Sequence, residues 1–131
     1  MEGRKNALIV IDGAAPIRNM AAAIAAVLKS FTVTVLTAGE FSGTQLLAAD
    51  ICFFGSETPN PPSFAYLGTV LGHINLAGRP CGVFSTSVDG AEYLRNLVHD
   101  SEITLYPVVL MEGKDNVKKW TESVTAQLKK R

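Results

Sequence analysis

Short apolar runs alternate with helical stripes along this chain, and that alternation limits its fold more than any other feature. The runs are rich in β-branched residues and too short for helices, so they predict strands at 7–11, 32–36, 51–54, 81–84 and 103–111. Apolar residues recur at helical spacing in the segments 16–28, 44–49, 64–74, 91–100 and 117–128. Five strand–helix repeats predict a parallel sheet covered by helices on both faces.

The polarity of the runs predicts their order in the sheet. Residues 32–36 alternate polar and apolar side chains, which is typical of a half-exposed edge strand. Pro107 cannot donate to a strand ladder, so the last strand is also expected at an edge. The other three runs are continuously apolar, as central strands require. We therefore expect one three-layer α/β/α domain over residues 1–131, with a five-stranded parallel sheet in the order 2-1-3-4-5.

Charge and cysteine content restrict the function classes. Twelve basic and twelve acidic residues give no net charge, whereas nucleic-acid binding usually needs a basic excess. Charged or turn residues interrupt every apolar run before it reaches membrane-spanning length. Cys52 and Cys81 form no CxxC motif, and with two histidines they make a poor metal site. We expect a cytoplasmic protein that holds no metal and binds neither nucleic acid nor membrane. So apolar a chain is compatible with a homodimer, although the sequence does not indicate which face would form the interface.

Ligands of such sheets bind outside the carboxyl ends of the strands, where the winding of the chain reverses. Here that point falls between the first and third strands. Three loops, at 12–15, 56–63 and 85–90, are expected to converge there. The candidate ligand-binding residues are Asp12, Gly13, Ala14, Ala15, Ile17, Ser56, Glu57, Thr58, Ser85, Thr86, Ser87 and Gly90.

Several segments resemble flavodoxins in order and spacing. The run 8–11, a tight loop and the segment 20–25 are similar to the opening of that family. Residues 49–59 resemble its third strand and following loop, and residues 78–86 its fourth strand. The resemblance covers nearly the whole chain, and it implies a flavodoxin-like fold, FMN as cofactor and electron transfer as function.

The first loop departs from the flavodoxin pattern. That family usually has Ser/Thr-x-Thr-Gly-x-Thr here, whose hydroxyls and backbone N–H groups hold the FMN phosphate. Residues 12–17 read Asp-Gly-Ala-Ala-Pro-Ile, so every hydroxyl is missing and Pro16 lacks an N–H group. Each hydrogen bond to a charged group is worth about 1.5–3 kcal/mol, so FMN binding is expected to be weakened or lost. Asp12 is expected either to fill the anion site at the helix start or to cap a turn and face solvent.

The favoured function is a flavodoxin-like domain with a binding or interaction role towards a small ligand or a protein partner. The alternative is a functional FMN electron-transfer protein or small flavin reductase. A phosphoacceptor receiver domain would need an aspartate where Gly55 and Ser56 stand, and a serine hydrolase would need a G-x-S-x-G motif. No catalytic constellation is found. The proline-rich segment 58–63 is either a stiff connector or a recognition surface.

Overall fold

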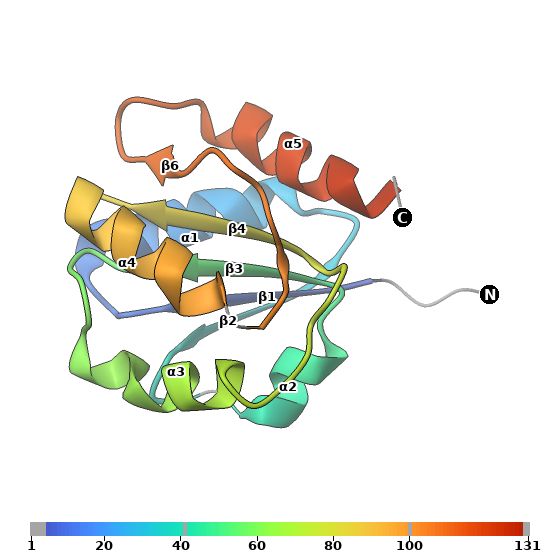
Figure 1. Cartoon of the computed structure of the whole chain (residues 1–131). Helices are drawn as coiled ribbons and strands as arrows, with labels where there is room; N and C mark the ends of the chain where they lie inside the picture. Colours follow the sequence, from blue (N-terminus) through green and yellow to red (C-terminus); the bar gives the residue numbers. More distant parts are fainter. Residues whose placement is uncertain (1–4, 41, 100, 130–131) are drawn as a thin grey trace.

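The computed structural model describes residues 5–40, 42–99 and 101–129, and its strands form one parallel sheet (Figure 1). The sheet has the order β2-β1-β3-β4-β5, which confirms the predicted 2-1-3-4-5 arrangement. The strands are β1 (Asn6–Ile11), β2 (Thr32–Thr37), β3 (Ile51–Gly55), β4 (Pro80–Ser85), β5 (Thr104–Leu105) and β6 (Leu110–Met111). The helices are α1 (Ala15–Val27), α2 (Gly43–Ala48), α3 (Ala65–Leu71), α4 (Val88–His99) and α5 (Val117–Lys129), with a short 3-10 helix, η1 (Pro62–Phe64).

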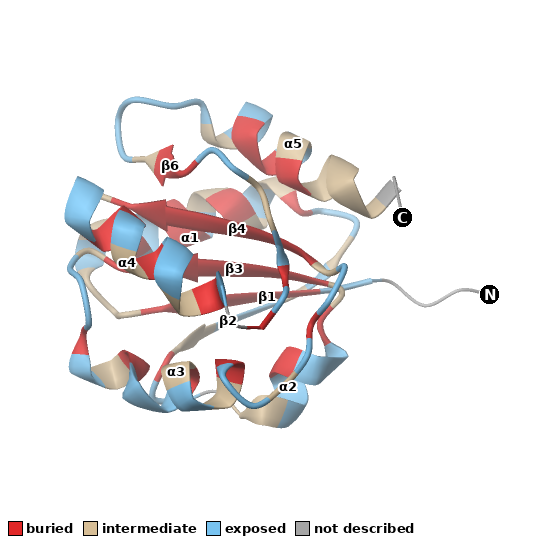
Figure 2. Cartoon of the chain, viewed as in Figure 1, coloured by how far each residue is buried: buried red, intermediate tan, exposed pale blue. Residues whose placement is uncertain are grey.

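Helices cover both faces of the sheet, and alternate residues of each strand point into two separate cores. In β1, Leu8 and Val10 face α2, α3 and α4, whereas Ile9 faces α1 and α5. The three central strands are buried along almost their whole length, as Figure 2 shows. This burial explains their continuous apolar sequences, because neither face of a central strand reaches water.

The prediction of one long last strand is wrong. The segment forms two short strands, β5 and β6, which both pair with β4 at different heights, so the sheet has six strands among the described residues rather than five. Pro107 lies between them, where the chain arches away from β4. Side chains hold this arch instead of a ladder: Arg95 donates to the Pro107 carbonyl at 3.2 Å, and Trp120 Nε1 to the Val108 carbonyl at 2.8 Å.

The helix predicted over residues 64–74 is shorter in the structure. It begins with η1, and α3 ends at Leu71, followed by a turn in which the His73 N–H bonds to the Val70 carbonyl at 3.0 Å. Gly72, which has low helix propensity, lies at this end. The end of α4 is described to His99, and Asp100 lies outside the described residues.

The described helices are short. The longest, α1 and α5, have 13 residues each, and none in the described part of the chain combines the length and apolarity needed to cross a bilayer.

Candidate functional site at the carboxyl ends of the strands

The three predicted loops meet where β1 and β3 end side by side. Ile11 and Gly55 are register partners at the ends of these two strands, so Asp12 and Ser56 leave the sheet at the same level. The Asp12 N–H donates to the Gly55 carbonyl at 3.2 Å, and the Ser56 N–H to the Phe84 carbonyl at 3.3 Å. Parallel strands thus bring residues far apart in sequence to one edge, as expected of this topology.

The Asp12 carboxylate joins the first two loops. Its Oδ1 accepts the Ala14 N–H at 3.0 Å, while its Oδ2 accepts the Glu57 N–H at 2.8 Å. The Ser56 hydroxyl lies 3.4 Å from the same Oδ2. Asp12 thus caps the turn that precedes α1, whose N-cap is Ala14, and it is half-buried rather than exposed. Its carboxylate accepts hydrogen bonds from backbone N–H groups of two loops at once.

Serine hydroxyls tie the second loop to the third. Ser85 is fully buried, and its hydroxyl donates to the Ser56 carbonyl at 2.6 Å. The Ser87 hydroxyl donates to the Glu57 carbonyl at 2.8 Å, and that of Ser56 to the Thr58 carbonyl at 2.6 Å. These three hydroxyls are thus engaged with backbone groups of the protein itself.

Gly90 lets the start of α4 approach the second loop closely. Its N–H donates to Ser87 Oγ at 3.0 Å. A Cβ at this position would lie 2.5 Å from Ser85 Oγ and 3.0 Å from the carbonyl oxygens of Ser56 and Glu57. A side chain here would therefore push the helix away from the loop. The close packing of α4 against the second loop thus depends on glycine at this position.

The start of α1 carries the remaining first-loop residues. Gly13 has a φ of +93°, a conformation that favours glycine, and its carbonyl accepts a hydrogen bond from Arg18 Nε at 2.9 Å. Ala15 is exposed at the first position of α1. Ile17 was predicted to contact a ligand, but its side chain is fully buried in the core beneath α1. Helical spacing turns this side chain towards the sheet, so only the backbone of Ile17 could serve the first loop.

The structure brings most of the predicted residues together. Those linked across or within the three loops by hydrogen bonds are Asp12, Ala14, Ser56, Glu57, Thr58, Ser85, Ser87 and Gly90. Thr86 is half-buried beside them. Sequence reasoning missed Arg18, whose guanidinium brings a positive charge to the first loop. A cation in the first turn after Pro16 is the signal that could have identified it.

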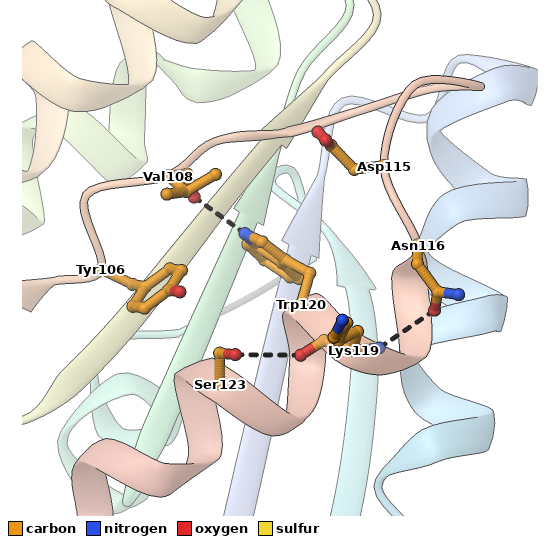
Figure 3. Close-up of a pocket in the computed structure, with 7 residues that line it drawn as sticks. All are labelled: Tyr106, Val108, Asp115, Asn116, Lys119, Trp120 and Ser123. Carbon is orange, nitrogen blue, oxygen red and sulfur yellow. Dashed lines mark hydrogen bonds between the residues drawn. The ribbon is translucent and has the colours of Figure 1, made fainter.

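Two of the hollows outside these loops lie beside the arch. The one in Figure 3 has a volume of about 240 Å³ and opens between the arch and α5, beside Trp120 and Lys119. The other has a volume of about 510 Å³ and lies along α4, where Val88 is 69% exposed and Val108 49% exposed. The linings of both hollows contain none of the predicted site residues.

The described residues contain no group of three histidine, cysteine or acidic side chains that could hold a metal ion. Cys52 and Cys81 are register partners on β3 and β4, and both are buried with free thiols. Burial raises the pKa of the Cys52 thiol to about 12, although the nearby Arg79 opposes that shift. Burial raises the pKa of Cys81 as well. Protonated, inaccessible thiols are poor nucleophiles and metal ligands.

Sequence comparison gives no relatives: no family model and no curated protein matches the chain. Comparison with solved structures does find similar proteins. Flavodoxin 2 from Bacillus cereus has 19% sequence identity and a TM-score of 0.76, covering 96% of this chain and 99% of its own. A flavodoxin from the domain Archaea has 18% identity and a TM-score of 0.77, covering 95% and 99%. A variant flavodoxin from Fusobacterium nucleatum, bound to flavin mononucleotide, has 12% identity and a TM-score of 0.69, covering 97% and 96%. With its parallel sheet in the order 2-1-3-4-5 and helices on both faces, the chain has the flavodoxin-like fold.

Proposed function

We propose that this chain is a cytoplasmic flavodoxin-like domain, spanning residues 1–131, that works as a binding or interaction module with weakened or lost FMN affinity. One observation carries the proposal: the Asp12 carboxylate occupies the N–H groups of Ala14 and Glu57 at the point where the winding reverses. Flavodoxin-like sheets bind FMN at this switch point.

The donor set fits an FMN phosphate poorly. A phosphate dianion at residues 12–17 would meet the negative charge of Asp12, no hydroxyl, and a proline without an N–H group. The hydroxyls of Ser56, Ser85 and Ser87 would have to break hydrogen bonds to backbone carbonyls before they could reach a ligand. Arg18 is the one favourable charge in this loop, and its Nε is bonded to the Gly13 carbonyl.

The hollow along α4 supports the interaction role. Its apolar lining is contributed by Val88, Ala91, Pro107, Val108, Val109 and Met111. Val88 and Val108 expose large apolar side chains, and the same lining contains the charged side chains of Glu92, Arg95 and Lys114. Apolar surface bordered by charge is typical of sites that bind proteins.

A second candidate is an FMN electron-transfer protein or small flavin reductase. The flavin-bound Fusobacterium nucleatum structure favours it, because that protein shares this fold over 97% of the chain. This function would require Asp12 to release at least one of its N–H donors or to take up a proton.

Titration with FMN, followed by quenching of flavin fluorescence, tests the proposal. The wild-type protein should bind weakly, and the double variant Asp12→Thr/Ala14→Thr should bind at least about tenfold more tightly, because it removes the like charge and adds two hydroxyls. Asp115→Thr is the matched control: its carboxylate also accepts a backbone N–H, from Met111 at 3.0 Å, but outside these loops. Its affinity should equal that of the wild type.

Two results would overturn the proposal. Wild-type protein purified with close to one equivalent of flavin would establish the second candidate. Equal FMN affinities for the wild type and the double variant, both shown to be folded by circular dichroism, would mean that the first loop is not the phosphate site.

A further inference from the structure

Strand β2 forms an edge of the sheet. It pairs with β1 on one side only among the described residues (Figure 1). Its sequence, Thr-Val-Thr-Val-Leu-Thr, contains no charge, proline or glycine. Edge strands of proteins that stay monomeric usually carry a lysine, a proline or a bulge that prevents pairing with another chain. The composition of β2 instead favours such pairing.

The ladder to β1 shows which backbone groups of β2 face outward. At its two ends, the Thr32 N–H donates to Lys5 and the Ala38 N–H to Ile11. Even-numbered residues therefore direct their N–H groups towards β1, and odd-numbered residues direct theirs away. The outward N–H of Thr37 is accepted by Glu40 Oε1 at 3.1 Å. Val33 and Val35 remain, each with an N–H and a carbonyl directed outward.

We propose that this edge binds a second copy of the chain, with the two β2 strands antiparallel and a two-fold axis at Thr34. Val33 then lies opposite Val35 of the second copy, and Val35 opposite its Val33. In antiparallel ladders such pairs exchange both hydrogen bonds, so the outward donors and acceptors of all four valines are used. A two-fold axis makes one strand complementary to itself, as homodimer symmetry requires.

Side chains and charges suit this register. Val35 is 43% exposed, and pairing places it against Val33 of the second copy on the same face of the joined sheet. Exposed Lys29 precedes β2, and exposed Glu40 follows it. Antiparallel pairing brings Lys29 near Glu40 of the second copy at both ends of the strand. Exposed ion pairs are worth at most about 1 kcal/mol, so we assign them a role in orientation rather than affinity.

Sedimentation velocity over a range of protein concentrations tests the dimer. The wild type should dimerise, and Val35→Lys should weaken the dimer at least about tenfold, because it places two ammonium groups at the interface. Leu47→Lys is the matched control, since Leu47 is 46% exposed but lies on α2, outside the β2 strand. A monomeric wild type, or a dimer lost in Leu47→Lys and kept in Val35→Lys, would overturn the proposal.

Disulfide formation tests the register. Thr34 lies opposite Thr34 of the second copy as a non-hydrogen-bonded pair, with Cβ atoms about 4.5–5.5 Å apart, so Thr34→Cys should cross-link under mild oxidation. Thr32→Cys changes another exposed threonine on the same face of β2. The two cysteines of this variant would lie about 13 Å apart in the dimer and should not cross-link. The native cysteines are buried and do not compete. Equal cross-linking of the two variants, or none in Thr34→Cys, would contradict this arrangement.

Discussion

The backbone N–H of Glu57 donates to Oδ2 of Asp12 at 2.8 Å, across 45 positions of sequence. Together with the Ser56 hydroxyl, 3.4 Å from the same oxygen, this bond joins the loop after β3 to the loop after β1. At the point where the winding reverses, the Asp12 carboxylate thus accepts a hydrogen bond that a ligand could otherwise accept. Substitutions around this bond therefore report on stability and on ligand access together.

Asp12→Ala should lower the free energy of unfolding by about 1–3 kcal/mol, because it leaves the partly buried N–H groups of Ala14 and Glu57 without their acceptor. Asp12→Asn keeps one side-chain oxygen acceptor, so its free energy of unfolding should fall by less. Urea unfolding followed by the fluorescence of Trp120, the single tryptophan, measures both changes. Identical losses in the two variants would show that the accepted hydrogen bonds are not what stabilises this loop.

Gly90→Ala should destabilise the protein by about 1–3 kcal/mol, since its Cβ would meet Ser85 Oγ at 2.5 Å and force α4 away from the second loop. Gly39→Ala is the matched control, because a Cβ there meets nothing within 4 Å. That change should stay within about 0.5 kcal/mol of the wild type. Amide hydrogen exchange should also accelerate at Ser87 and Gly90 in the first variant only. Equal unfolding free energies for both variants would rule out the crowding.

Alkaline pH should destabilise the fold through Cys52. Its thiol ionises near pH 9 when unfolded but has a native pKa of about 12, so the native state holds the proton more tightly. The contribution of this thiol to the free energy of unfolding is therefore fully retained below about pH 9 and is lost as pH rises from about 9 towards 12. Urea unfolding at about pH 8 and about pH 10 measures the loss.

Cys52→Ala provides the control for this pH dependence. The variant should begin less stable, because a buried group is removed, but its stability should fall less steeply above pH 9. The same slope in variant and wild type would show that the Cys52 thiol is not responsible.

The layered fold could be predicted because its signals are local. Burial on both faces makes β1, β3 and β4 continuously apolar, and the alternation in β2 marks the edge where Thr34 and Val35 are exposed. These patterns depend on the environment of each strand and not on a particular partner. The last strand could not be predicted in the same way, because side chains of Arg95 and Trp120 hold the arch at Pro107 and Val108.

The meeting of the three loops could be predicted, but the hydrogen bonds between them could not. Topology alone brings Asp12, Ser56 and Ser85 to one edge, because each lies at the carboxyl end of a strand. Their partners were not, because the Ser85 hydroxyl bonds to a carbonyl 29 positions away and Asp12 to an amide 45 positions away. Nothing in the local sequence states whether a serine at a strand end points to a ligand or into the loop beside it.

The arch between β5 and β6 is a site where the chain should tolerate insertions. Both short strands keep their own pairing with β4, and between them only the Tyr106 N–H is seen to bond to that strand, at the Cys81 carbonyl (2.8 Å). Extra residues inserted next to Pro107 would extend a surface loop without shifting the register of the sheet. Evolution or protein engineering could thus graft a new segment here, beside the hollow along α4, and change what this domain recognises while its architecture stays intact.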